Sequence, residues 1–102
     1  MHELEARPAL ESDLPAILDL LADDVLGQQR EQIGPPIPAH YHTAFAAIKA
    51  DKNQLLAVFE YHDTLVGCLQ LSFIPGLSRQ GMWRGQIEAV RISATHRGKG
   101  FG

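Results

Sequence analysis

The sequence contains very little cysteine and no long hydrophobic run. Of its 102 residues only Cys68 is a cysteine, so no internal disulfide can form and nothing argues for secretion. No apolar run approaches the ~20 residues that a helix needs to cross a bilayer. The first residues, Met-His-Glu-Leu-Glu, also lack the basic start and apolar core of a signal peptide. We therefore expect a cytoplasmic protein that does not enter a membrane.

Metal ligands and repeats are also scarce. His40 and His42 lie two residues apart, so on a helix their side chains point in different directions. No cysteine or carboxylate cluster accompanies them, and we expect no metal site. The sequence shows no internal repeat, low-complexity tract or linker. A hydrophobic fraction of 45% and a charged fraction of 21% are ordinary for one globular domain.

The net charge of −3 hides an uneven distribution of charge. Acidic side chains dominate residues 1–31, whereas residues 79–102 carry four arginines and Lys99 against Glu88 alone. Such a basic end can attract an anionic ligand without binding nucleic acid in general, so we expect no nucleic-acid partner. The alternative is that these charges only form a solvated surface.

Hydrophobic spacing predicts one strand and then two helices. Residues 3–8 alternate between polar and apolar side chains and stop at Pro8, as a short strand does. Ser12 is placed to cap a helix. The apolar face of that helix comprises Leu14, Ile17, Leu18, Leu21 and Val25. Glycines and prolines of residues 27–38 end it, and a second helix is predicted over residues 39–50.

The rest of the chain is typical of three strands joined as a meander. Strands are predicted over residues 55–61, 65–74 and 82–94, with a tight turn at residues 62–63 and a loop at residues 75–81. In the second of these strands, one face is predicted to carry Leu65, Gly67, Leu69, Leu71 and Phe73. Gln70 and Ser72 lie on the other face. The order strand, two helices, three strands predicts an α+β fold with a largely antiparallel sheet.

The last strand changes its apolar parity. Ile87 and Ala89 share one side of the strand, whereas Val90 and Ile92 share the other. One extra residue at this point, a β-bulge, would return both pairs to one face and leave a ladder amide unpaired. A strand buried on both faces explains the pattern equally well.

A glycine-rich loop follows this strand. Its residues are Arg97-Gly98-Lys99-Gly100-Phe101-Gly102. Glycines let the backbone approach a ligand closely, and successive N–H groups in such a loop form a nest for an anion. The loop matches neither the Walker A motif nor the dinucleotide-binding fingerprint. A glycine-rich turn without any ligand remains an equal alternative on these residues alone.

This loop resembles the Arg/Gln-x-x-Gly-x-Gly/Ala signature of GNAT-type N-acetyltransferases at every fixed position. Glu88-Ala89-Val90-Arg91-Ile92 looks like that family's fourth strand, and Gln70 to Ser78 and Gln86 to Arg91 look like a bacterial branch of small members. The preceding elements follow the family's order. The resemblance covers the whole chain, and its most specific part is the final 15 or so residues.

The resemblance implies an acetyl-CoA-dependent acyltransferase that acetylates an amine acceptor by direct attack. It implies that Arg97, Gly98, Lys99, Gly100, Phe101 and Gly102 hold the coenzyme A pyrophosphate. The backbone of Val90, Arg91 and Ile92 would pair with the pantetheine arm, and an amide beside the bulge would polarise the thioester. Glu88 is the candidate general base; alternatively it pairs with Arg84 or Arg91, or is simply solvated.

Family members are about half as long again as this chain. Residues 1–102 would therefore be the N-terminal part of a single domain, truncated before the third helix and expected to be inactive alone. Its last strand would form an open edge, and the fragment would dimerise or aggregate through residues 87–94. The alternative function is a non-catalytic half-domain that binds acyl-CoA or a partner protein. Tyr41 and Trp83 are candidates for the acceptor site, although packing in the core or a loop is favoured for both.

Overall fold

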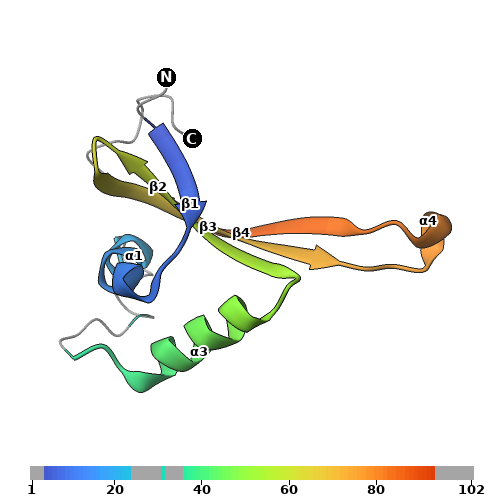
Figure 1. The fold of residues 1–102 in the computed structure, drawn as a ribbon, viewed down its shortest axis with the longest axis horizontal. Coiled ribbons are helices and arrows are strands. Elements are labelled where there is room, and N and C mark those ends of the chain that lie inside the picture. The colour runs from blue at the N-terminus through green and yellow to red at the C-terminus, as the bar shows by residue number, and fades with distance from the viewer. Residues whose placement is uncertain (1–3, 24–30, 32–35, 94–102) are drawn as a thin grey trace.

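The computed structural model describes residues 4–23, 31 and 36–93. In these residues, a four-stranded antiparallel sheet carries helices on one side (Figure 1). The strands are β1 (Leu4–Pro8), β2 (Gln54–Tyr61), β3 (Thr64–Ile74) and β4 (Arg84–Ile92). The helices are the 3₁₀ turn η1 (Glu11–Asp13), α1 (Leu14–Leu21), α3 (Ala39–Ala50) and the short turn α4 (Ser78–Gly81). This arrangement confirms the predicted α+β class and element order.

The sheet has the order β1-β2-β3-β4, so each strand pairs with the next strand in the chain. A two-residue turn at His62 and Asp63 joins β2 to β3, with φ values of 52° and 63°. Positive φ at both central residues is the geometry of a hairpin turn that matches the twist of its strands. The tight turn predicted at these residues is confirmed.

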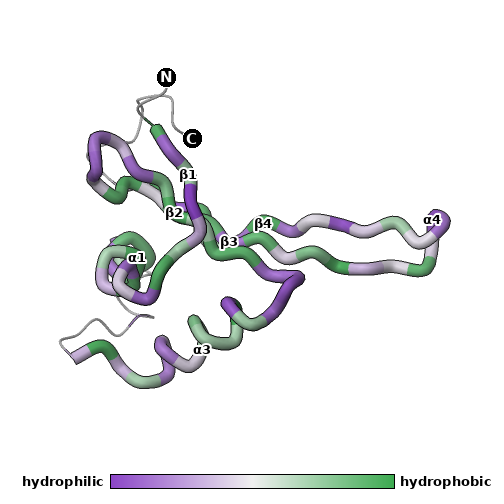
Figure 2. Tube along the Cα trace, in the orientation of Figure 1, coloured by the Kyte–Doolittle hydropathy of each residue, from purple (hydrophilic) through white to green (hydrophobic). Residues whose placement is uncertain are grey.

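The core lies between α1 and the centre of the sheet. Ile17 and Leu20 from α1 pack against Val58 of β2 and Cys68 of β3, and all four side chains are buried. Figure 2 shows the apolar segments of α1, β2 and β3 converging at this point. Helix α3 covers the beginning of β2, where Phe45 is its buried residue. None of the helices within the described ranges is long and apolar enough to span a membrane.

The start of α1 differs from the prediction. Ser12 does not cap it: Asp13 is the cap residue of α1, and η1 precedes it. The Asp13 carboxylate accepts a hydrogen bond from the backbone N–H of Leu10 at 2.7 Å and two from the guanidinium of Arg7 at 2.8 and 3.0 Å. Arg7 also donates to Glu60 at 3.1 Å. This carboxylate network ties β1 and β2 to η1, and it fixes the start of the helix in place of a serine cap.

Leu65 of β3 lies on the face of the sheet opposite to the predicted one. The pairing of β2 and β3 is irregular beside Phe59: Phe59 pairs with Gly67, but Glu60 pairs with Leu65. The extra residue is Val66, and it turns Leu65 toward the core, where Leu65 packs against the α1 cluster. The prediction that Leu65 shares a face with Gly67 was therefore wrong, because period-2 alternation fails across a bulge.

The opposite face of the sheet carries Gly67, Leu69, Leu71 and Phe73 of β3 beside Ile87 and Ile92 of β4. Phe73 and Ile87 are exposed on it. Within the part of the chain that the structure describes, no helix packs over this face (Figure 1).

Candidate active site

The candidate site is built around a bulge in β4. Gln70 of β3 pairs with Glu88, and Cys68 pairs with Arg91, so one β3 residue faces two residues of β4, Ala89 and Val90. This two-against-one arrangement defines a β-bulge. It places Ile87 and Ile92 on the same face, paired with Leu71 and Gly67, as the change in parity predicts. The bulge is confirmed, and the strand buried on both faces is not observed.

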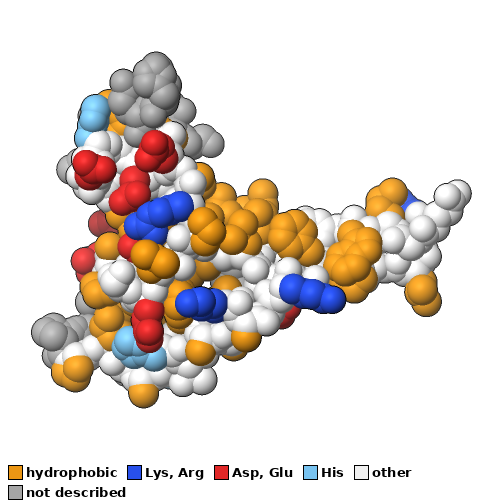
Figure 3. All heavy atoms as spheres, viewed as in Figure 1, with side chains coloured by type: hydrophobic (Ala, Val, Ile, Leu, Met, Phe, Trp, Pro, Cys, Tyr) orange, Lys and Arg blue, Asp and Glu red, His pale blue; other side chains and the backbone are white. Residues whose placement is uncertain are grey.

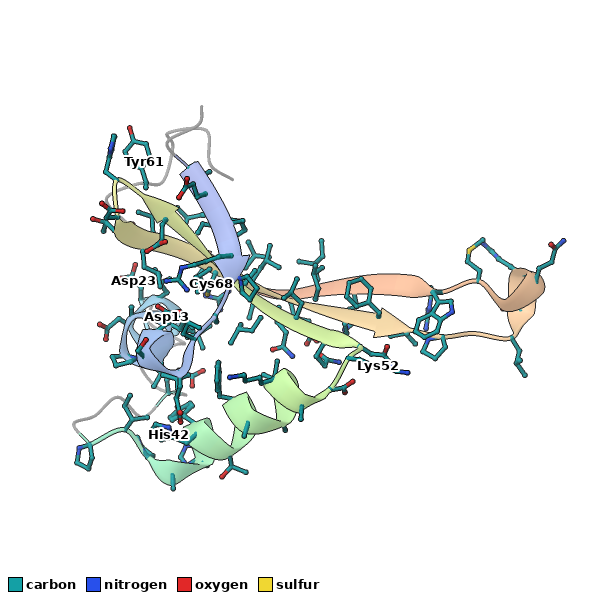
Figure 4. The ribbon with its side chains drawn as sticks, in the orientation of Figure 1. Asp13, Asp23, His42, Lys52, Tyr61 and Cys68 are labelled. Carbon is teal, nitrogen blue, oxygen red and sulfur yellow. The ribbon has the colours of Figure 1, made fainter. Side chains whose placement is uncertain are left out.

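Ala89 has a φ of 55°, which a residue with a side chain adopts at a cost of roughly 1–2 kcal/mol. The Cys68 thiol donates a hydrogen bond to the carbonyl oxygen of Ala89 at 3.7 Å between Sγ and oxygen. Cys68 is 1% exposed at the centre of the sheet (Figure 4). Burial raises the pKa of this thiol to about 11, and the nearby Arg91 opposes that shift. The thiol is therefore protonated at neutral pH, and its hydrogen bond to Ala89 stabilises the bulge.

Gly67 lets β3 and β4 come close together beside the bulge. A Cβ atom at this position would lie 2.9 Å from the Arg91 carbonyl oxygen and 2.9 Å from Cδ1 of Ile92. Sequence analysis placed Gly67 on a face but gave it no role. A glycine inside a strand is a signal of close backbone approach, so the sequence did contain a hint.

Glu88 lies one residue before the bulge and on the same face as Gln70. It is exposed, and it has no hydrogen bond or ion pair with any residue in the described ranges. The alternative in which Glu88 pairs with Arg84 or Arg91 is therefore wrong. An unpaired carboxylate next to the bulge remains accessible to a substrate or a water molecule.

Val90, Arg91 and Ile92 form the end of β4. The Arg91 Nη1 donates to the carbonyl oxygen of Val90 at 2.9 Å, while its Nε is buried and without a partner in the described part of the chain. Directly after β4, the N–H of Ser93 donates to the carbonyl oxygen of Val66 at 2.7 Å. On its other edge, β4 has no strand beside it among residues 4–23, 31 and 36–93. The glycine loop, Arg97 to Gly102, lies outside the described residues.

The remaining candidates lie elsewhere. The Tyr41 hydroxyl donates to Glu31 at 2.7 Å, and the ring of His40 packs against it at 4.4 Å between centroids. His42 shares a hydrogen bond of 2.7 Å with Glu11. Trp83 lies just before β4 and is 54% exposed, so it belongs to no core. The structure does not bring these side chains to the bulge.

The sequence matches a known protein family. A family model described as the acetyltransferase (GNAT) family matches residues 14–102. The chain belongs to the GNAT acetyltransferase family. A comparison with curated protein sequences found no match.

Several solved structures have a similar fold. A transcriptional regulator from Bacillus halodurans is 45% identical with a TM-score of 0.89, over 95% of this chain and 65% of that one. A Trypanosoma brucei acetyltransferase is 29% identical with a TM-score of 0.70, over the same shares. A Clostridium acetobutylicum protein predicted to be an acetyltransferase, and solved with acetyl-CoA, shares the fold at 16% identity with a TM-score of 0.65, over 96% and 65%. The chain thus spans 65% of the length of each of these three solved structures.

Proposed function

We propose that this GNAT protein transfers an acetyl group from acetyl-CoA to an amine of a small molecule or a protein. The observation that supports this most directly is the bulge at Ala89 and Val90, which lies on a strand that leads into the glycine loop. Residues 1–102 would then be part of a single N-acetyltransferase domain in the cytoplasm. The proposal includes no membrane, nucleic-acid or metal partner.

Acetyl-CoA supplies an activated thioester, and β4 with its following loop is suited to hold it. An extended pantetheine arm can pair with the free edge of β4 at Val90, Arg91 and Ile92, much as another strand would. The amides and cations of Arg97 to Gly102 form a nest for the pyrophosphate. The basic character of this end of the chain favours such an anionic ligand.

The amide beside the bulge acts as the donor to the thioester carbonyl, a role that is typically worth several kcal/mol in the transition state. Glu88 removes a proton from the acceptor, directly or through water, because a free amine is mostly protonated at neutral pH. The amine nitrogen then bonds to the carbonyl carbon, the carbon–sulfur bond breaks, and the departing thiolate of coenzyme A takes up the second proton that the nitrogen loses. Because Cys68 is buried and protonated, no thiolate beside the bulge competes as a covalent acyl carrier.

Binding and chemistry are tested separately. Gly100→Val in a protein that contains the entire domain should abolish acetyl-CoA binding by calorimetry, because a β-branched side chain keeps the backbone from the pyrophosphate. Undiminished binding would remove the loop from the site. Binding by the wild type with no acetylation of any amine in a broad screen would instead favour a non-catalytic domain that only binds acyl-CoA.

Glu88→Gln tests the general base. It should lower kcat/KM by about 10²–10⁴-fold while acetyl-CoA affinity is kept, and the acidic limb of the pH–rate profile should move. Asp19→Asn removes a comparable exposed carboxylate from α1 and serves as the control. If both variants keep the wild-type profile, Glu88 is only a surface charge.

A further inference from the structure

The connection between β3 and β4 projects away from the helices as an arm, defined here as residues 75–84 (Figure 1). Every residue of this arm is exposed. At its tip, Arg79, Gln80 and Gly81 have φ values of 55°, 64° and 78°. Non-glycine residues in this region are strained, and such strain gathers at active sites, ligand clamps and switch regions.

Large apolar side chains lie on the arm. Leu77 is 97% exposed, Met82 is 52% exposed and Trp83 is 54% exposed. Figure 3 shows apolar patches along the arm. Methionine, tryptophan and arginine are enriched at protein interfaces, and a contiguous exposed apolar patch with polar residues around it is typical of an interaction site.

Two cations flank a hollow in the arm. The hollow has a volume of about 460 Å³ and is lined by Pro75, Gly76, Ser78, Arg79, Met82 and Arg84. Neither Arg79 nor Arg84 has a hydrogen bond or ion pair with another described residue. The arm contains no acidic residue. Two unpaired guanidinium groups beside apolar side chains fit an acidic protein surface.

An acidic surface of this kind lies at the far end of the same molecule. Glu5 on β1 and Asp63 in the β2–β3 turn are exposed, and neither has a partner among the described residues. Both lie at the same end of the β1–β2 pair, because Glu5 pairs with Glu60 and Asp63 follows the end of β2 at Tyr61. Figure 3 shows most of the acidic side chains at this end, opposite the arm.

We propose that the arm of one molecule docks on the acidic end of a second copy, defined by Glu5 and Asp63. Two molecules in antiparallel orientation make this contact twice around a two-fold axis, which closes the assembly as a dimer. The apolar side chains of the arm then lose water, and Arg79 and Arg84 gain carboxylate partners. This interface is separate from pairing through the β4 edge and does not depend on acetyltransferase activity.

Charge reversal on either surface tests the dimer by sedimentation equilibrium. Arg79→Asn with Arg84→Glu should weaken dimerisation by about tenfold or more, and so should Glu5→Lys with Asp63→Asn. Asparagine is used at positions 79 and 63 because it tolerates positive φ. Lys49→Glu with Lys52→Asn makes a matched charge change on exposed residues off the arm and should have little effect.

Mixing the two interface variants gives the decisive result. In a protein that contains the entire domain, each variant should be mainly monomeric alone, but together they should form a heterodimer, since both of its contacts pair opposite charges. Trp83 is the single tryptophan, so its emission should shift to the blue as the wild type dimerises. A monomeric wild type, a dimer whose Trp83 emission does not shift, or variants that fail to restore each other would each overturn the proposal.

Discussion

Gly67 gives the sharpest test of how β3 supports the bulge in β4. In Gly67→Ala, the new methyl carbon would lie 2.9 Å from the carbonyl oxygen of Arg91. Cδ1 of Ile92, also at 2.9 Å, and Cδ2 of Phe59, at 3.3 Å, belong to side chains that can turn away. The Arg91 carbonyl belongs to the strand itself, so it moves only if β4 moves with it.

The expected effect follows from two opposing terms. Overpacking of this kind costs about 1–3 kcal/mol. Replacing glycine with alanine in a compatible conformation recovers about 0.4–1 kcal/mol by restricting the unfolded chain. Overpacking wins, and we expect a net loss of about 1–2 kcal/mol in the free energy of unfolding. For a domain of this size that lowers Tm by roughly 4–8 °C per kcal/mol.

Gly85→Ala is the matched control on the same hairpin. No atom lies within 4 Å of a Cβ at Gly85, and Gly85 is exposed at the beginning of β4. This variant should keep or slightly raise the free energy of unfolding. Thermal and urea unfolding followed by circular dichroism measure both variants, and calorimetry should show weaker acetyl-CoA binding only for Gly67→Ala. If Gly67→Ala is as stable as Gly85→Ala and binds equally well, the close approach at the bulge does not govern the position of β4.

Two further predictions concern Asp13 and Cys68. The Arg7 hydrogen bonds hold the pKa of Asp13 below its usual value, so its stabilisation is complete above the unfolded pKa near ~3.9 and is lost as the pH falls through the lower folded pKa. Asp13→Asn should therefore cost about 1–2 kcal/mol at pH 7, a difference that shrinks below about pH 4 in urea unfolding; a constant difference would contradict the linkage. Raising the Cys68 pKa from 9.0 to about 11 lowers its thiolate fraction near pH 8 by about 100-fold, so labelling by a thiol reagent should be slow in the native state and fast in urea. Rapid native labelling would contradict the burial of Cys68.

Much of the fold followed from local patterns. The helix over residues 39–50 has the predicted bounds, and the hairpin turn at residues 62–63 joins the two strands as expected. The parity change in β4 allowed either a bulge or a strand buried on both faces, and the pairing with β3 shows the bulge. These features depend on residues close together in the chain, where period and turn chemistry carry the information.

The predictions that failed depend on contacts between distant residues. Ser12 has the right chemistry for a cap, but Arg7 and Glu60, brought in by β1 and β2, place Asp13 there instead. Leu65 follows strict alternation in sequence, and only its pairing with Glu60 reveals the extra residue in β3. Neither contact can be recognised from the neighbouring residues in the sequence, so tertiary structure determines both.

Strained backbone occurs in the β2–β3 turn and also at both proposed contact sites. Among the described residues, five that are not glycine have positive φ. Two form the β2–β3 turn, where the hairpin geometry requires them. The other three are Arg79 and Gln80 at the tip of the arm and Ala89 in the bulge. A strained alanine inside a strand persists only because its surroundings hold it, here the Cys68 thiol and the close packing at Gly67. The same hairpin therefore carries strain at both ends, with acetyl transfer proposed at one and self-association at the other.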